Sequence, residues 1–481
     1  MIEPQGGSGS ARAKSGNAAA PRGQLRNPAL RAAGARSLLA AVLAWAGVAV
    51  PAWGLDLVDS YLAAQSHDPI LAAAQAAHTG AVEIVPQAES KMGASVVAGA
   101  AGGVLNAHLL GFQPASGYTT QFTASLDQPL FNRPNTISID QAQSTMVQID
   151  SILAGAEMDL VVRVAQGYFT VLLARDLLEA TLQDKEAIAL QLASVKRGFE
   201  VGTRPITDVT DVQTRYDIVV VQEVQDRGNL EVAEQAFEIV TGIRAEALAG
   251  VVKDIWLRPP QPENLQYWVS AAQERNPGVV QAAATLDVKR QEIDRTRAMW
   301  YPTLDLVSNY SKQNYSRADL NVAGFGGKTA EIGLQLSLTV WDGGMRNSLL
   351  RQANAGADQA LDNLQGTRNG AVELARQSYT NATTTISQVH ALDQAVDAAR
   401  VSLEGALRGY EVGTRTVVDV LNARELLFQA LRQLAASHYN ALLYGVELRS
   451  AVGELSARDL EGLTSSSAPS GLFATQPPIP H

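Results

Sequence analysis

Few side chains in this sequence are spaced as catalytic or metal-binding groups are. The six histidines are scattered along the chain, and none stands in an H-E-x-x-H or similar ligand motif. The sequence has no cysteine, which excludes thiol nucleophiles, cysteine-based metal sites and disulfide bonds. No glycine-rich loop follows a predicted strand as a phosphate-binding loop would. We therefore expect a protein that is not an enzyme and needs no cofactor or metal; a hydrolase built on two carboxylates is the alternative left open.

The polar motif that stands out is one that occurs twice. Residues 197–204 read R-G-F-E-V-G-T-R, and residues 408–415, which begin 211 positions later (408 minus 197), read R-G-Y-E-V-G-T-R. A match at all but one position indicates an internal duplication. Gly202 and Gly413 suit the left-handed position that ends a helix, and the threonine after each suits the N-cap of a following helix. The motif thus predicts two helix–turn–helix reversals, whose arginines and glutamates either bind a partner or are simply solvated.

The composition argues against one class of partner, and the N-terminal residues indicate that the protein is exported. The chain has 481 residues, a formal charge of −10 and a pI near 5.2, which argues against a nucleic-acid surface. Residues 1–54 read as a signal peptide, because a basic region precedes an apolar run too short for the ~20 residues of a spanning helix. A small-x-small pattern places the cleavage between Gly54 and Leu55. We expect two structural repeats, residues 55–260 and 261–455, followed by a disordered C-terminal tail, residues 456–481.

Each repeat contains two short segments that read as strands: residues 94–105 and 118–127 in the first repeat, and residues 303–311 and 331–340 in the second. Apolar and polar residues alternate, as they do in strands, in residues 118–127 and most regularly in residues 331–340. Residues 303–311 alternate less regularly, and the Gly- and Ala-rich residues 94–105 hardly alternate at all. Strands of about ten residues with one apolar face fit a membrane β-barrel, although an antiparallel sheet on a soluble core gives the same alternation. Since four strands are too few to close a barrel, the membrane interpretation requires several chains to contribute strands.

Long helical stretches surround the predicted strands. Residues 56–91 read as helix, and residues 134–197 contain no proline after the first position and only two glycines. At 1.5 Å per residue, the second stretch would reach about 95 Å, which is too long for the core of a compact domain. Residues 344–408 repeat this feature. Each long helix ends at one copy of the repeated motif, so both turns should lie at the helix ends opposite the strands.

The signal peptide, the duplicated halves, the strand pairs, the long helices and the R-G-[FY]-x-V-G-T…D-V turns together resemble the TolC-like outer-membrane channel family. The resemblance covers essentially the whole chain after residue 54. It implies a mainly α-helical homotrimer with a β membrane part, in which twelve strands form one β-barrel in the bacterial outer membrane. Twelve helices would continue it as a long tunnel through the periplasm. The implied partners are a periplasmic adaptor (membrane fusion protein), an inner-membrane ABC transporter, a secreted protein cargo and outer-membrane lipid.

The same resemblance assigns a gate to the turns. It implies that Tyr410 and Arg415 tie the inner coiled coil shut, with Asp208 and Thr207 beyond the first turn as their partners. Polar contacts of this kind contribute only about 1 kcal/mol each, so a docking partner could break them. We therefore expect these four residues to form a periplasmic gate.

Two further positions belong to the implied gate, and the rest of the motif to the docking surface. Asp419 matches a family aspartate that rings the closed entrance. Asn422 stands where the best-known member has a second aspartate, so this chain should bind cations more weakly at the constriction. The resemblance implies that the adaptor-docking tip consists of Arg197, Gly198, Glu200, Val201, Gly202, Thr203, Arg408, Gly409, Glu411, Val412, Gly413 and Thr414.

Three functions remain to be weighed on the sequence alone. The leading one is the channel-tunnel of a tripartite type I secretion system, a passive exit duct for a secreted protein toxin. The alternative within the channel class is the outer-membrane component of a multidrug efflux pump. A third interpretation is a periplasmic coiled-coil protein that tethers other components without forming a pore, which would purify without detergent as a soluble rod.

Overall fold

The computed structural model describes residues 55–107, 115–245, 248–251, 259–317 and 326–465. The predicted signal peptide, including Gly54, lies outside these residues. Leu55 is the first of them and forms an isolated β-bridge with Leu248. No helix in the part of the chain that the structure describes is long and apolar enough to cross a membrane.

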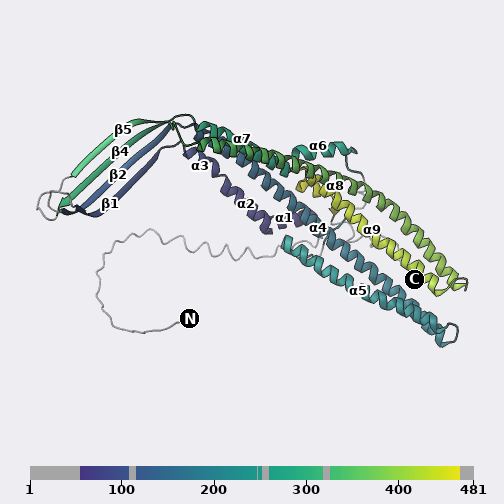
Figure 1. Cartoon of the computed structure of the whole chain (residues 1–481). Helices are drawn as coiled ribbons and strands as arrows, with labels where there is room; N and C mark the ends of the chain where they lie inside the picture. The colour runs from purple at the N-terminus through teal and green to yellow at the C-terminus, as the bar shows by residue number, and fades with distance from the viewer. Residues whose placement is uncertain (1–54, 108–114, 246–247, 252–258, 318–325, 466–481) are drawn as a thin grey trace, which may run out of the picture. The chain divides into compact units, whose positions relative to one another are not determined.

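The described elements follow one another as two similar runs (Figure 1). The first run comprises α1 (Leu57–His67), α2 (Pro69–Ala81), α3 (Ile84–Ser90), β1 (Ser95–Ala107), β2 (Ala115–Phe131), α4 (Arg133–Glu200) and α5 (Ile206–Thr241). The second comprises α6 (Leu265–Arg275), α7 (Pro277–Ala298), β4 (Thr303–Arg317), β5 (Gly326–Ser337), α8 (Met345–Glu411) and α9 (Val417–Ala451). The short elements are β3 (Gly250–Val251), the 3-10 helix η1 (Ala457–Leu460) and β6 (Thr464–Ser465). Both runs show the predicted order of helix, two strands, long helix and returning helix.

Strands β1, β2, β4 and β5 form one antiparallel sheet in the order β1-β2-β4-β5. Residues directly opposite one another in a ladder share a face. On one face Leu334 of β5 lies opposite Leu306 of β4, and on the other Glu331 lies opposite Asn309. The sheet therefore has the apolar and the polar face that the alternation predicts. Each strand has more residues than its predicted segment, because ladder pairing continues into polar and glycine-rich ends that lack alternation. At its other end β5 stops at Ser337, so the prediction was wrong for residues 338–340.

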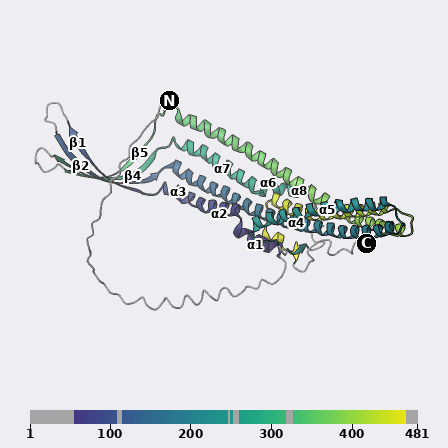
Figure 2. The same cartoon turned by 90° about the horizontal axis from the view of Figure 1, so that it is seen from below.

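The two long helices carry most of the helical packing. Helix α4 has 68 residues and α8 has 67, which confirms the predicted long stretches. Helix α4 packs along α5, α7 and α9, and α8 packs along α9, α7 and α6 (Figures 1 and 2). Asn132 caps α4 directly after β2 by accepting a hydrogen bond from the Asn135 N–H at 3.1 Å. Because α4 begins at the sheet, the turn at its other end is remote from the sheet, and the same holds for α8.

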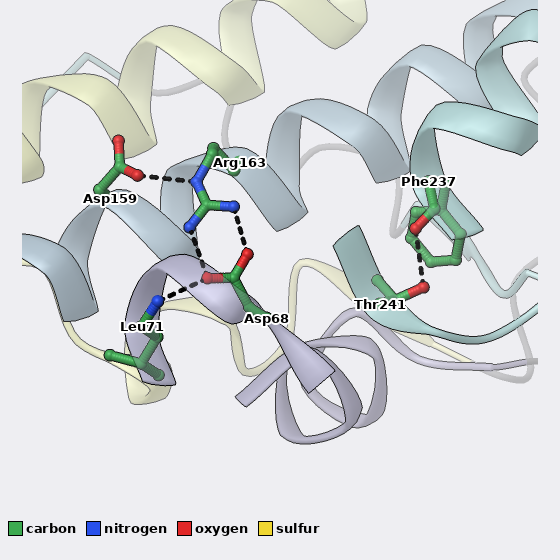
Figure 3. Close-up of polar contacts among 6 residues, drawn as sticks. All are labelled: Asp68, Leu71, Asp159, Arg163, Phe237 and Thr241. Atoms are coloured by element: carbon green, nitrogen blue, oxygen red, sulfur yellow. Dashed lines mark hydrogen bonds and ion pairs between the residues drawn. The ribbon is translucent and has the colours of Figure 1, made fainter. Parts of the chain in front are cut away.

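An ion pair on the buried Asp68 attaches α2 to α4 (Figure 3). Asp68 caps α2 by accepting a hydrogen bond from the Leu71 N–H at 2.7 Å. The guanidinium of Arg163 on α4 donates to both carboxylate oxygens of Asp68, at 2.6 and 3.1 Å, and to Asp159 at 2.7 Å. The hydrogen bonds from Arg163 hold the pKa of Asp68 below its ordinary value, although burial opposes this. The ion pair thus fixes the start of α2 against α4.

The largest apolar cluster joins α1, α4, α5 and α9 with the C-terminal segment. Tyr168 lies fully buried in it, and so do Leu460 and Leu463. Strand β6 pairs with β3 beside them. The expectation of a disordered tail from residue 456 was therefore wrong for residues 456–465, because buried leucines anchor this segment in the core. The remainder of the expected tail lies outside the described residues.

Candidate functional site

The first copy of the repeated motif closes the turn between α4 and α5. Gly202 has a left-handed backbone with φ of 77°, as predicted. The Gly198 carbonyl accepts hydrogen bonds from the Thr203 N–H at 2.8 Å, the Arg204 N–H at 3.2 Å and the Thr203 hydroxyl at 2.9 Å. A Cβ at position 198 would lie 2.7 Å from Cγ of Arg204. The turn therefore favours glycine at position 202 because of the left-handed backbone, and at position 198 because a side chain there would lie too close to Arg204.

The second copy closes the turn between α8 and α9 in the same way. Gly413 has φ of 79°. The Gly409 carbonyl accepts from the Thr414 N–H at 2.8 Å, the Arg415 N–H at 3.1 Å and the Thr414 hydroxyl at 3.1 Å. A Cβ at position 409 would lie 2.6 Å from Cγ of Arg415. The repeated sequence thus encodes one turn geometry built twice.

The predicted N-caps of the returning helices were wrong. The hydroxyls of Thr203 and Thr414 bind the carbonyls that close the turns, so they do not cap the next helix. Helix α5 has Pro205 as its N-cap, without a side-chain hydrogen bond. Helix α9 has Thr416, which forms a capping box with Asp419. The two turns therefore have the same backbone conformation but differ in how the next helix starts.

Asp419, the acid expected at the closed entrance of the channel, takes part in capping the start of α9. It accepts hydrogen bonds from the Thr416 N–H at 2.8 Å and the Thr416 hydroxyl at 2.9 Å. These bonds, and then the charge of Arg415 at 3.9 Å, hold the pKa of Asp419 below its ordinary value. Asn422 is exposed on the next turn of α9. The membership of Asp419 and Asn422 in a constriction stays a prediction.

Both turns present exposed valines to solvent. Val201 is 73% exposed, and Val412, at the same motif position, is 75% exposed. Gly198 and Gly409 are half-buried beneath the chain that they bind. The other predicted docking residues are exposed: Arg197, Glu200, Gly202, Thr203, Arg408, Glu411, Gly413 and Thr414. Backbone geometry and exposure therefore make the two turns equivalent surfaces.

Tyr410 connects the two helix pairs. Its ring packs against the apolar clusters of both pairs, and the Arg204 guanidinium of the first turn lies 4.3 Å from the ring centre. Burial raises the pKa of Tyr410, the charge of Arg204 lowers it, and Asp208 is near enough to raise it further. The structure thus places the Tyr410 ring against Arg204 and within reach of the charge of Asp208.

The other expected gate pair is placed differently. Arg415 lies 3.9 Å from Asp419 of its own turn, and Thr207 is exposed in the first turn of α5. The role of Thr207, Asp208, Tyr410 and Arg415 as a lock stays a prediction. Sequence reasoning missed Arg204, whose cation–π contact depends on how two distant segments pack.

A buried polar layer joins α4, α5 and α9 farther from the turns, and sequence reasoning missed it too. Arg432 of α9 donates to both carboxylate oxygens of Asp226 on α5, at 2.8 and 3.2 Å, and to the Thr181 hydroxyl on α4 at 3.1 Å. Asp226 is 1% exposed. Burial alone would raise its pKa, but the hydrogen bonds from Arg432 and Thr181 hold it below its ordinary value. The layer fixes the register of α9 against the α4–α5 pair.

A second buried charge lies between this layer and the turns. Asp184 of α4 is 3% exposed and faces Arg424 of α9, also 3% exposed. Burial raises the pKa of Asp184 to about 6, although Arg424 and Arg215 lower it; Glu425 raises it. Arg215 and Glu425 form an ion pair between α5 and α9. The sequence signal was an aspartate on the helix face of Ala180 and Ala187, where a core residue is expected.

The match to known proteins agrees with this architecture. The family model described as outer membrane efflux protein matches residues 61–242 and 268–454. Outer membrane protein TolC of Vibrio cholerae is 30% identical over 409 residues, which cover 85% of this chain and 93% of that protein. The alkaline protease secretion protein AprF of Pseudomonas aeruginosa is 26% identical over 341 residues, 70% of each chain. The crystal structure of VceC from Vibrio cholerae matches with a TM-score of 0.71 at 17% identity, over 82% of this chain and 96% of that one.

The family match and the similarity to TolC show that this chain is an outer-membrane channel protein whose long helices form a periplasmic tunnel. The chain belongs to the outer membrane efflux protein family, whose members are TolC-like transport channels rather than enzymes.

Proposed function

We propose that this channel is the exit duct of a type I secretion system and that three copies assemble around one passage for a secreted protein toxin. The similarity to a protease secretion protein supports the secretion branch of the family. The sheet supports assembly, because β1 and β5 are its edge strands and present unpaired backbone groups that neighbouring copies would satisfy.

The observation that carries the proposal is the pair of equivalent turns at the helix ends remote from the sheet. Val201 and Val412 are both about three-quarters exposed on rigid, multiply hydrogen-bonded loops. A rigid loop loses little conformational entropy when a partner binds it. We infer that the hairpin of a periplasmic adaptor docks on these turns and that an inner-membrane ABC transporter supplies the energy.

Docking can be tested by site-specific crosslinking, because the sequence has no cysteine of its own. A Val201→Cys or Val412→Cys channel, expressed with its adaptor, should crosslink to the adaptor through a short thiol-reactive linker. The matched control is Val82→Cys, an exposed valine between α2 and α3. Crosslinking at position 82 but at neither turn would refute the docking surface.

The cargo is tested genetically. Under the proposed function, deletion of the channel traps a secreted protein toxin inside the cell. The efflux alternative is supported by the description of the family as efflux proteins, and it expects increased drug sensitivity without a secretion defect. In either case, expression of the wild-type chain in the deletion strain should restore the lost secretion or the lost drug resistance.

A further inference from the structure

Two lysines lie directly opposite each other in the sheet. Lys312 of β4 faces Lys328 of β5, and both side chains are exposed. Phe122 of β2 is the partner of Lys312 on its other side. The rings of Phe122 and Tyr310 meet edge-on, with their centroids 6.4 Å apart. A pair of positive charges thus adjoins a pair of aromatic rings.

These lysines are unusual for the face that carries them. The register places them on the apolar face, in line with Leu306 and Leu334. They are the only charged side chains that the described strand residues place on this face. The carboxylates of the sheet, on Asp127, Asp305 and Glu331, all belong to the opposite, polar face.

The lysines also lie at a defined depth along the sheet. Lys312 follows the first residue of β4 by nine positions, so at 3.3 Å per residue it lies about 30 Å along the strand from the helices. The hydrocarbon core of a bilayer is about 30 Å thick, and strands of outer-membrane proteins are tilted across it. Exposed Trp300, Tyr301 and Trp341 stand at the helical end of the sheet. Exposed aromatic residues thus follow the helices where the sheet begins, and Phe122 and Tyr310 lie near the lysines, a distribution found at membrane–water interfaces.

We propose that Lys312 and Lys328 together bind the phosphate groups of an anionic lipid in the membrane leaflet at the end of the sheet remote from the helices. This inference rests on the proposed function, since it requires the sheet to lie in the outer membrane. Like charges directly opposite in a ladder repel each other, and a shared anion removes this cost. No described carboxylate of the same face can serve as that anion. The lysine stems can extend from the apolar region to the headgroups, where phosphate is available.

The test uses the full-length channel in nanodiscs of neutral lipid with a fluorescent, doubly phosphorylated glycolipid, titrated by energy transfer from the protein. We expect the double variant Lys312→Gln with Lys328→Gln to bind this lipid about thirtyfold more weakly, since a lysine near an anionic surface contributes about a factor of five. Lys312→Arg with Lys328→Arg should retain most of the affinity. Lys289→Gln, an exposed lysine of α7 outside the sheet, is the matched control and should bind as the wild type does.

Three results would overturn the inference. They are unchanged binding by the double glutamine variant, equal binding of the dephosphorylated glycolipid, and displacement of the lipid by millimolar inorganic phosphate, which would indicate a general anion site. If the double variant fails to insert, Lys312→Gln alone is measured, with an expected loss of about fivefold. Single-channel conductance separates the two proposals: a wild type without conductance refutes the channel, whereas normal conductance with lysine-independent lipid binding refutes only the lipid site.

Discussion

Asp184 makes the stability of the helical part depend on pH near neutrality. Its carboxyl is 3% exposed between α4 and α9, where it faces the guanidinium of Arg424, itself always charged. Arg215 of α5 and Glu425 of α9 also act on it. One oxygen of Asp184 has no hydrogen-bond partner among the residues that the structure describes. Burial therefore outweighs the nearby positive charge, and the pKa of Asp184 rises from its ordinary 3.8 to about 6.

The sign and size of the effect follow from proton linkage. The folded state binds the proton more tightly than the unfolded state does, so the stability contributed by this group is complete below pH 3.8 and is lost as pH rises through 6. The full difference of about two pKa units corresponds to about 3 kcal/mol. Between pH 7.5 and pH 5.0 the free energy of unfolding should rise by about 1.4 kcal/mol from this group alone.

The perturbation is Asp184→Asn, which removes the titration while keeping the size of the side chain. Urea unfolding of the helices, followed by circular dichroism in detergent at a series of pH values, gives the stability of each protein. Subtracting the free energy of unfolding of the variant from that of the wild type removes the contributions of all other titrating groups. This difference should change by about 1.4 kcal/mol between pH 7.5 and pH 5.0. Asp217→Asn, an exposed aspartate of α5, is the control and should leave the pH profile unchanged. Parallel profiles for wild type and Asp184→Asn would refute the argument that burial dominates at this site.

Two further predictions concern contacts between the helix pairs. Arg204→Ser removes the cation on the Tyr410 ring, worth about 0.5–1 kcal/mol, and should raise the open probability in planar bilayers about two- to fivefold. Tyr410→Phe with Arg415→Ser should also raise conductance, and an unchanged closed state in both proteins would contradict the gate. Asp226→Asn leaves the Arg432 guanidinium without its buried counter-charge and should destabilise the helices by about 3 kcal/mol in thermal unfolding. Asp217→Asn is again the reference, and an equal loss there would contradict a specific role of the buried pair.

The local features of this fold were predictable because their causes are local. The left-handed backbone at Gly202 and Gly413 follows from the glycine itself, and the length of the helices follows from an unbroken helical pattern. The role of Thr203 was mispredicted because its hydroxyl can either bind a carbonyl behind it or cap the helix ahead. Which bond forms depends on the closure of the turn, and that is not visible in residue preferences.

Contacts between residues far apart in the sequence could not be predicted from local sequence patterns. Asp184 and Arg424 are 240 positions apart (424 minus 184), and nothing in either helix indicates that the other will cover it. The lysine pair of the sheet is of the same kind, since strand register decides whether Lys312 and Lys328 meet. The prediction of disorder from residue 456 was wrong for the same reason, because Leu460 and Leu463 are buried against helices far away in the sequence.

The two turns show how a duplicated motif can acquire an asymmetric function. Arg204 and Arg415 occupy the same motif position, yet Arg204 reaches the aromatic ring of the other half while Arg415 lies near Asp419 of its own turn. Phe199 is exposed, whereas its counterpart Tyr410 packs between the helix pairs, with the Arg204 guanidinium over its ring. The shared residues therefore build the turn, and the one motif residue that differs contacts the other half beside the turns.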